Sequence, residues 1–373
     1  MDFQRFTDLA QAAEWYDHWA RSAAMPLWWA KGADHVRGGF HEALSVEGQP
    51  RPGARRARVQ SRQVYAYAIA GAMNWDGPWR EAAWHGMDFF LERFRRPDGL
   101  FRTLVGLDGK VLDDTAMLYD QAFALLGTAT LHRVDPRGAE LSEVALGVLD
   151  GLQAMRHPAG GFRENIAYPF QANAHMHILE GALAWGAHGL DPRWDDLADE
   201  IVEMTLRTFI DPDGCFLREF FDTDWKLAAG DDGRLLEPGH QFEWAWLLES
   251  WGRLRGRQDA LAAARGLYAA GRRGVDPGRD VVMNELWDDF TVRETTARLW
   301  PQTERLKAEL LFGSEADQLA AAESLRRYLA APAPGVWYDK LRADGSFIDE
   351  PAPATSFYHI LCACTELFRV AGR

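Results

Sequence analysis

Asp98-Gly99-Leu100-Phe101 separates two stretches of helical periodicity, residues 81–95 and 116–132, and its pattern returns along the whole chain. The glycine allows the positive φ that follows a helix end, and the aromatic side chain then drops back into the core. A pattern that returns at steps of about sixty residues indicates a repeated structural unit. The other copies are Gly38-Gly39-Phe40, Gly160-Gly161-Phe162, Asp213-Gly214-Cys215-Phe216, Gly335-Val336-Trp337 and a weaker one near Gly278-Arg279-Asp280.

Helical periodicity fills nearly all of the sequence between these turns, and alternating strand patterns are scarce and short. About sixty residues hold two helices of about 15 residues and their two loops. Six such helical hairpins account for the 373 residues of the chain. Apolar positions recur at steps of three and four in residues 9–20, 61–74, 81–95, 116–132, 140–155, 174–188, 195–209, 241–254, 258–272, 294–312, 315–330 and 356–370.

Six antiparallel hairpins close most simply into two concentric rings of helices. The sequence therefore predicts an all-α fold, an (α/α)6 barrel of six helical hairpins, whose inner helices surround a central cavity. An open α-solenoid is the alternative, but it would show more regular repeats and fewer than the sixteen tryptophans present. No linker or low-complexity stretch divides the chain, so we expect a single catalytic domain over residues 1–373.

The composition narrows the range of partners. The net charge of −14 repels phosphate backbones and anionic membranes, so we expect no nucleic-acid and no membrane partner, although one buried phosphate site is compatible with it. No signal-peptide pattern opens the sequence, and no apolar run approaches the ~18 residues of a membrane span, so we expect a cytoplasmic protein. Three cysteines, Cys215, Cys362 and Cys364, fit free thiols in a reducing compartment.

Residues 173–181 combine asparagine, histidine and glutamate within one helical pattern. Asn173, His177 and Glu180 share a helix face, which indicates a stripe that binds sugar or handles protons, with a structural hydrogen-bonded cluster as the alternative. His175 and His177 suggest a metal site, but residues two apart on a helix diverge by about 200°. We therefore expect no metal ion at this segment.

Two further histidines open helices after proline-containing loops. His240 follows Pro238-Gly239, and Glu243 lies on the same helix face. A helix N-terminus favours the neutral imidazole and a nearby carboxylate orients the ring, so the pair is predicted to act as a general base, with helix capping as the alternative. His359 opens the last helical segment in the same way. We expect the two histidines to face one cavity, where one takes a proton and the other donates one.

Arg62 and several acidic residues complete the candidates. Arg62 lies at an aromatic-rich helix start, where a guanidinium can bind a substrate oxygen and stabilise an enolate; a surface charge is the alternative. Asp114 and Glu304 are candidate substrate-binding carboxylates, and a further carboxylate, Asp120, lies in the same segment as Asp114. Two such carboxylates would act as acid and base in a glycoside hydrolase, a class that also occurs on this barrel. No dinucleotide-binding glycine motif and no P-loop is present, so we expect no nucleotide cofactor.

Taken together, these segments resemble the N-acylglucosamine 2-epimerase superfamily, which includes N-acyl-D-glucosamine and cellobiose 2-epimerases and mannose and sulfoquinovose isomerases. The resemblance spans nearly the whole chain and implies an (α/α)6 barrel and a reaction without metal or other cofactor. The motifs that carry it are Ser61-Arg62-Gln63-Val64-Tyr65, Tyr119-Asp120-Gln121-Ala122-Phe123, Asn173-Ala174-His175-Met176-His177-Ile178-Leu179-Glu180, Gly239-His240-Gln241-Phe242-Glu243, Trp300-Pro301-Gln302-Thr303-Glu304 and Tyr358-His359.

The resemblance also implies roles for individual residues. Arg62 is similar to the arginine that binds near O1 and O2 of the sugar, and His177 to the active-site histidine of the middle helix. His240 and His359 are similar to the two catalytic acid–base histidines, and Glu243 to the glutamate near them.

The stretch before the last histidine points to one branch of the superfamily. Cellobiose epimerases carry a tryptophan five residues before that histidine, where this chain has Ala354, and the stretch is more similar to mannose isomerases. We therefore expect isomerisation of free D-mannose to D-fructose, or of a related monosaccharide, through an enediol, in a monomer or homodimer. The alternatives are N-acyl-D-glucosamine 2-epimerase or mannose-6-phosphate isomerase activity, a glycoside hydrolase or lyase, and a sugar-binding protein without activity.

Overall fold

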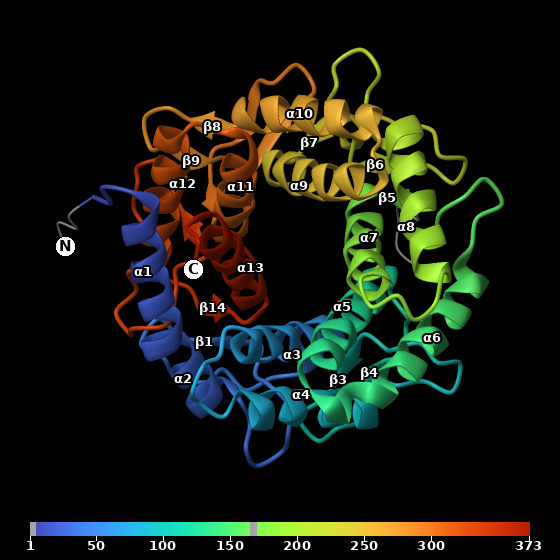
Figure 1. Cartoon of the computed structure of the whole chain (residues 1–373), viewed down its shortest axis with the longest axis vertical. Coiled ribbons are helices and arrows are strands. Elements are labelled where there is room, and N and C mark those ends of the chain that lie inside the picture. The colour runs from blue at the N-terminus through green and yellow to red at the C-terminus, as the bar shows by residue number, and fades with distance from the viewer. Residues whose placement is uncertain (1–4, 165–169) are drawn as a thin grey trace.

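Helices in two concentric rings make up the fold (Figure 1), which the computed structural model describes for residues 5–164 and 170–373. The rings confirm the predicted (α/α)6 barrel. The inner helices are α3 (Ala57–Ala72), α5 (Leu118–Val134), α7 (Ala172–Gly186), α9 (Pro238–Arg255), α11 (Leu299–Phe312) and α13 (Thr355–Val370). The outer helices are α1 (Leu9–Trp19), extended by α2 (Met25–Leu27), α4 (Trp79–Phe94), α6 (Leu141–Gly151), α8 (Arg193–Met204), α10 (Gln258–Arg272) and α12 (Glu315–Tyr328).

The two rings differ in how their helices bury apolar side chains. The outer helix α8 buries one stripe at steps of three and four, which includes Trp194, Leu197 and Ile201, and exposes its other face. The inner helix α5 is buried at every position from Asp120 to Leu131, because neighbours pack on all its sides. A helix that is buried all round must therefore place its polar groups where they find partners or face an internal cavity.

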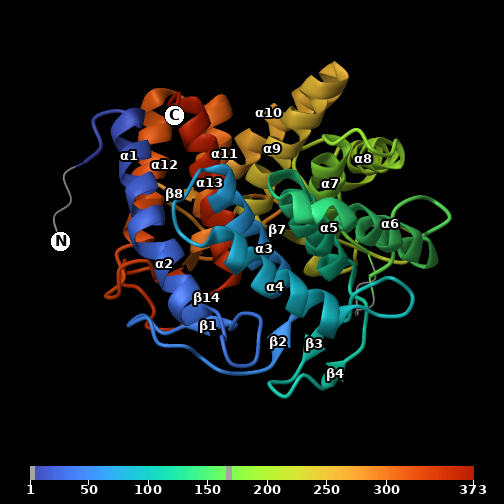
Figure 2. The same ribbon diagram turned by 60° about the horizontal axis from the view of Figure 1, so that its bottom comes forward.

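Short antiparallel strand pairs collect at the end of the barrel where the inner helices begin, which lies at the bottom of Figure 2. Several of these strands run directly into an inner helix, so the strand pairs fix where each helix starts. They are β1 (Ala43–Leu44) with β14 (Ala352–Pro353), β2 (Arg55–Arg56) with β3 (Leu104–Val105) and β4 (Val111–Asp113), β5 (Phe170–Gln171) with β6 (Phe220–Phe221), β7 (Leu235–Leu236) with β10 (Glu285–Trp287) and β11 (Val292–Glu294), β8 (Val275–Asp276) with β9 (Val281–Val282), and β12 (Ala297–Arg298) with β13 (Lys340–Leu341).

One helix boundary differs clearly from the prediction. The expected helix over residues 294–312 begins only at Leu299, because Ala297 and Arg298 pair with Leu341 and Lys340 of β13. Strand pairing with a distant segment of the chain cannot be read from local periodicity, and it overrides the helical pattern here.

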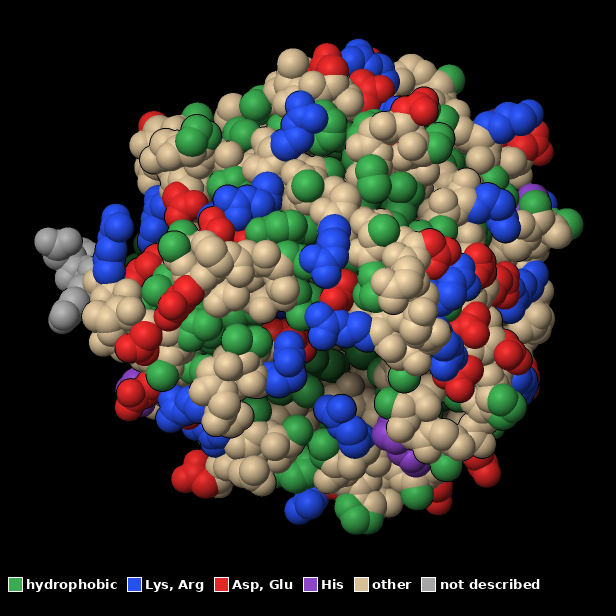
Figure 3. All heavy atoms as spheres, turned by 45° about the horizontal axis from the view of Figure 1, so that its top comes forward, with side chains coloured by type: hydrophobic (Ala, Val, Ile, Leu, Met, Phe, Trp, Pro, Cys, Tyr) green, Lys and Arg blue, Asp and Glu red, His purple; other side chains and the backbone are tan. Residues whose placement is uncertain are grey.

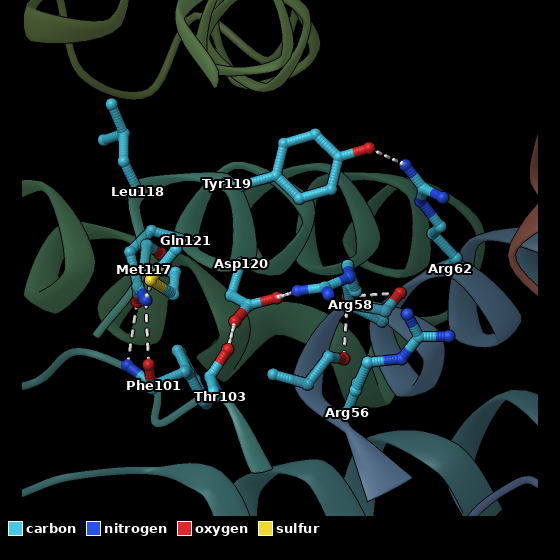
Figure 4. Close-up of polar contacts among 12 residues, drawn as sticks. Arg56, Arg58, Arg62, Phe101, Thr103, Met117, Leu118, Tyr119, Asp120 and Gln121 are labelled. Carbon is cyan, nitrogen blue, oxygen red and sulfur yellow. Dashed lines mark hydrogen bonds and ion pairs between the residues drawn. The ribbon is translucent and has the colours of Figure 1, made fainter. Parts of the chain in front are cut away.

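A glutamine near the start of an inner helix clamps the repeated turn that precedes it. The backbone N–H of Phe101 donates to Oε1 of Gln121 at 2.8 Å, and Nε2 of Gln121 donates to the Phe101 carbonyl at 2.8 Å (Figure 4). On α7, Nε2 of His175 accepts the N–H of Phe162 at 3.0 Å in the same place. We call the glutamine pairs the glutamine clamps. Besides Gln121 with Phe101 they are Gln60 with Phe40, Gln241 with Leu217 and Gln302 with Val282.

The first and last segments of the chain close the ring. Strands β1 and β14 pair with Ala43 opposite Pro353 and Leu44 opposite Ala352. Nε2 of Gln63 on α3 donates to the carbonyl of Ala354 at 2.9 Å, at the start of α13. The inner ring is thus continuous, and among the described helices none is long and apolar enough to cross a membrane.

Candidate active site

A cavity of about 190 Å³ lies inside the ring at the end where the inner helices begin. Each inner helix contributes at least one side chain from its first two turns, so six helix N-termini surround one small volume. Their partial positive charges favour an anion there. The lining residues are Arg62 from α3, Tyr119 from α5, Asn173 and His177 from α7, His240 and Glu243 from α9, Trp300 from α11, Thr355, Ser356 and His359 from α13, and Glu237 and Arg298 just before α9 and α11.

His359 is held in the cavity wall as a neutral ring. Its Nδ1 lies 2.9 Å from Oε1 of Glu304, whose other oxygen lies 2.5 Å from Nζ of Lys307. Burial lowers the pKa of His359 to about 4, although Glu304 opposes this shift. Burial raises the pKa of Glu304, but Lys307 and His359 outweigh burial and hold it at about 2. Glu304 is therefore a carboxylate that accepts the Nδ1–H of His359, and Nε2 of the ring is free to take a proton.

His240, on α9, is held in the opposite protonation state. Its Nδ1 lies 2.9 Å from Oε2 of Glu219 and 3.8 Å from Oε2 of Glu237. Burial alone lowers the pKa of this imidazole, but the two carboxylates outweigh burial and raise the pKa of His240 to about 10. At neutral pH His240 is therefore an imidazolium, which is the form of a general acid.

The expected neutral His240 oriented by Glu243 is corrected by these contacts. Glu219 holds the ring, and Glu243 lies 3.9 Å from Nδ1 of His177 instead. Burial and the nearby Glu304 raise the pKa of Glu243 well above its usual range, so both disfavour its charged form. The i, i+3 spacing places Glu243 on the right face of the helix, but it does not show that a loop residue approaches His240 more closely.

Glu219 is one of the residues at the site that sequence reasoning missed, and a signal for it does exist. It lies two residues after Leu217, the residue held by the clamp of Gln241. In other repeats the same place is taken by Glu42 and Glu164, two residues after the turn phenylalanine. A carboxylate at a recurring place beside the start of an inner helix is the pattern that would have identified it.

Glu180 connects His177 to the last helix from behind the cavity. Its Oε2 lies 3.3 Å from Nδ1 of His177, and the hydroxyl of Tyr358 donates to its Oε1 at 2.6 Å. Burial lowers the pKa of His177 to about 4, while Glu180 opposes the shift, so this ring is neutral as well. Burial raises the pKa of Glu180, but His177 outweighs it and the net shift is downward.

Arg62 and Asn173 present polar atoms to the cavity. Nη2 of Arg62 donates to the hydroxyl of Tyr119 at 2.7 Å (Figure 4), and the guanidinium lies 3.8 Å from the ring centroid of Phe123. Nε of Arg62 and Oδ1 of Asn173 are buried and have no hydrogen-bond partner among the described residues. Buried polar atoms of this kind require a ligand or solvent partner, which fits the sugar-binding role expected for both residues.

Three predicted carboxylates lie outside the cavity. Asp114 is exposed and pairs with Arg96 at 3.3 Å and Arg102 at 3.0 Å, so the expected contact with substrate is wrong. The loop between β4 and α5 carries it away from the cavity, to the surface beside two guanidinium groups. Glu180 and Glu304 are close to the site, but they orient histidines and do not line the cavity as expected.

Asp120 is a structural residue. Its carboxylate pairs with Arg58 at 3.0 Å and accepts a hydrogen bond from Thr103, and its side chain is fully buried (Figure 4). Neither Asp114 nor Asp120 faces the cavity, so the acid–base pair that the hydrolase alternative needed is not formed by them.

The tryptophans serve mainly in packing. Trp28 stacks on Trp337 with ring centroids 4.7 Å apart, and both rings are fully buried. Among the tryptophans of the described chain, Trp300 lines the cavity, with its ring centroid 5.0 Å from that of His240 and 5.8 Å from that of His359. Trp300 lies next to both histidines, where a sugar face can pack on its ring.

Three groups of one histidine and two glutamates place possible ligand atoms within 4.8 Å of one another. A divalent ion held by Glu243, Glu304 and His359 would lie beside the ammonium of Lys307, and Coulomb repulsion disfavours that arrangement. The other two groups are Glu219–Glu237–His240, whose histidine is cationic, and His177–Glu180–Glu243. The expectation of a metal-free site stays a prediction.

The other end of the barrel has a different character. A cavity of about 700 Å³ opens where the inner helices end, and Lys and Arg side chains gather around the hollow on that face (Figure 3). Arg133 and Arg369 are among its lining residues, and cations there offset the partial negative charge of helix C-termini. The histidine pair lies at the opposite end.

Comparisons with known sequences identify the family of the chain. The sequence model of the N-acylglucosamine 2-epimerase (GlcNAc 2-epimerase) family matches residues 38–363. A relative named mannose-6-phosphate isomerase, from Rhizobium meliloti (strain 1021), is 46% identical over 366 residues, which cover 94% of this chain and 95% of the relative. A relative named D-mannose isomerase, from Marinomonas mediterranea, is 23% identical over 363 residues, which cover 89% and 91% of the two chains.

A solved structure shows the same fold. The cellobiose 2-epimerase from Spirochaeta thermophila superposes with a TM-score of 0.85 at 22% identity, and the match covers 98% of this chain and 97% of that chain. Together with the family match over most of the sequence, these findings show that the chain belongs to the N-acylglucosamine 2-epimerase family and is an isomerase or epimerase of sugars.

Proposed function

We propose that the protein is an aldose–ketose isomerase that converts free D-mannose to D-fructose through an enediol. One observation carries the proposal: a base and an acid, neutral His359 and cationic His240, face the same cavity. Paired groups whose surroundings push their pKa values apart are the acid–base assignments of an active site. The volume of about 190 Å³ suits a monosaccharide, since pockets for larger ligands run to about 300–1,000 Å³.

The proton transfers balance within these two side chains. With the open-chain aldose bound, Nε2 of His359 takes the proton from C2, and Nε2–H of His240 protonates O1, which gives the enediol. His240 then takes the proton from O2 as the C2 carbonyl forms, and His359 returns its proton to C1. Both histidines end in their starting states, and the product is the ketose. Delivery of a proton to the opposite face of C2 would give the epimer instead.

Charge that develops on O1 and O2 meets a prepared environment. Arg62 lines the cavity and its buried Nε has no hydrogen-bond partner among the described residues, and six helix N-termini add partial positive charge around the cavity. Such donors stabilise the enediolate more than the neutral sugar, which is the condition for lowering the barrier.

Mannose 6-phosphate is the second candidate substrate, and two observations favour it. The relative at 46% identity carries the name mannose-6-phosphate isomerase. Arg298 lines the cavity with a side chain that is 41% exposed, and its Nε lies 3.7 Å from Asp339, so the guanidinium is open to a phosphate.

Proton NMR in D2O tests the proposal and separates the candidates. Purified protein, with and without EDTA, is given D-mannose, mannose 6-phosphate or N-acetylmannosamine. We expect fructose with deuterium at C1 from D-mannose, at a higher kcat/KM than for the phosphate. A preference for mannose 6-phosphate would replace the first candidate by the second. Deuterium at C2 of a C2 epimer would show epimerisation, and no turnover of any of the three sugars would refute the proposal.

A further inference from the structure

Lys307 is a buried cation that the reaction steps do not use. Its side chain, on α11, is 1% exposed and does not line the cavity. Its Nζ lies 2.5 Å from Oε2 of Glu304 and 4.3 Å from the ring centroid of Trp246. A buried ammonium is energetically costly unless its partners are fixed, so its presence behind the wall of the cavity calls for a role.

The groups that act on Lys307 come from α11 itself, from its inner neighbours α9 and α13, and from α7. Burial lowers the pKa of the Lys307 ammonium, but three carboxyl groups and one thiol outweigh burial and raise it. They are Glu304 from α11, Glu243 from α9, Glu180 from α7 and the thiol of Cys362 from α13. His359 of α13 shares Glu304 with Lys307, and Arg62 and His177 also act on His359. Of the three carboxyls, Glu304 is the one in direct contact with both the ammonium and the base.

We propose that Lys307 is a positioning residue: its ammonium fixes Glu304 as the carboxylate that accepts the Nδ1–H of His359, so that Nε2 of this ring is free to face the sugar. The inference rests on the proposed isomerase function for the identity of the reaction. The tautomer of His359, in contrast, follows from the contacts alone. In free histidine the proton is not confined to Nδ1, so the protein must impose this state.

Removal of the ammonium has a definite sign. Without Lys307, Glu304 lies among neutral or negative carboxyls and binds a proton more strongly. If this proton stays on Glu304, Glu304 donates to Nδ1 of His359 and the neutral ring carries its own proton on Nε2. If the proton passes to His359, the ring becomes an imidazolium. In both cases Nε2 carries a proton below the raised pKa, and the base is lost there. The acid limb of the pH profile, where activity falls as pH is lowered, must therefore move to higher pH.

The kinetic experiment compares Lys307→Met with Lys307→Arg in the full-length protein. We expect Lys307→Met to move the acid limb upward by about 1–3 pH units from about 4. At pH 5, where the wild type still holds a neutral His359, kcat should then fall roughly two- to a hundredfold, with KM within a few fold. Lys307→Arg keeps the charge and should keep the position of the limb. Arg305→Met is the matched control, because it removes another buried cation of α11 that pairs with Asp280 at 2.8 Å, away from the cavity. It should lower stability and leave the limb in place.

A second measurement does not depend on turnover. Ring nitrogens in 1H–15N spectra report the tautomer, and the His359 signals are assigned by their loss in His359→Asn. At pH 5 we expect the Nδ1–H tautomer in the wild-type protein and in Lys307→Arg, and its loss in Lys307→Met. A different tautomer in the wild type would overturn the inference, even if Lys307→Met failed to fold. An unchanged tautomer in folded Lys307→Met would overturn it as well. The expected tautomers without sugar turnover would leave this inference standing and remove the proposed function.

Discussion

His359 and His240 each bind carboxylates through Nδ1, yet the two rings hold different charges. The ammonium of Lys307 balances the negative charge of Glu304, so Glu304 raises the pKa of His359 by less than burial lowers it. Glu219 and Glu237 both raise the pKa of His240 against the effect of burial, and neither forms an ion pair with a lysine of the described chain. The group that pairs with each carboxylate thus decides which histidine is the base and which is the acid. A histidine–carboxylate pair on its own would not reveal this.

The pH dependence of activity follows from these two rings. His359 must be neutral, so kcat/KM should fall as pH drops through about 4, where the ring gains a proton. His240 must be charged, so kcat/KM should fall as pH rises through about 10, where the ring loses its proton. We expect a broad plateau between these limits in initial rates measured across the range. A narrow bell centred near the ordinary histidine pKa would contradict both assignments.

Substitution of the base gives a second test at this scale. His359→Asn should lower kcat by roughly 10²–10⁴-fold, because general base catalysis is lost while the ring's place stays polar. Asp114→Asn is the control, since Asp114 is exposed and lies outside the cavity, and its activity should match the wild type. Both are compared by initial rates on the same sugar, with folding checked by circular dichroism. Near-normal activity of His359→Asn would remove His359 from the mechanism.

The residues that sequence could identify are those on the inner helices themselves. His177, His240, His359, Arg62 and Asn173 lie on helix faces that periodicity and motif place together, and the structure brings them to one cavity. Glu219 and Lys307 could not be assigned in this way. The contact of Glu219 crosses from a loop to a helix, and the role of Lys307 depends on the charge of its neighbour.

At the scale of single elements, the glutamine clamps fix how each repeated turn meets the next inner helix. Each clamp satisfies one backbone N–H and one carbonyl in a buried turn that the short strands leave unpaired. The recurrence of the turn glycine and aromatic residue was readable from sequence, and so were the twelve main helices. The clamp was not, because a glutamine in a helical pattern gives no sign that its amide points toward a turn twenty residues earlier.

The clamp of α5 can be tested directly. Gln121→Leu leaves the N–H and carbonyl of Phe101 unpaired in a buried place, which should cost about 1–3 kcal/mol for each group. Urea unfolding followed by tryptophan fluorescence measures the loss. Gln153→Leu changes an exposed glutamine and should alter stability by less than about 0.5 kcal/mol. Equal stabilities of the two variants would show that the clamp contributes nothing.

At the scale of the whole molecule, all inner helices point the same way, and this gives the barrel two unlike ends. Their N-termini surround the cavity of the two histidines, and their C-termini surround the arginine-rich hollow. The cavity is therefore prepared for a negative charge although the chain carries −14 overall.

An anionic mimic of the enediolate should exploit this field. We expect D-mannonohydroxamate, which ionises to a planar anion, to inhibit with a Ki at least about a hundredfold below the KM for D-mannose. The matched neutral compound, D-mannonamide, lacks the charge and should bind no better than substrate. Competition assays on the same enzyme preparation give both constants. Equal affinities for the two compounds would show that the helix N-termini and Arg62 do not stabilise a developing anion.

The six inner helices also offer six equivalent positions, because each places a residue of its first two turns on the cavity wall. A change at one of them replaces one chemical group and leaves the other five, and the clamps behind them, as they were. Scaffold and chemistry are therefore separable in this barrel. A new reaction could be assembled on the same barrel by changing one hairpin at a time, without a change to the rest of the ring.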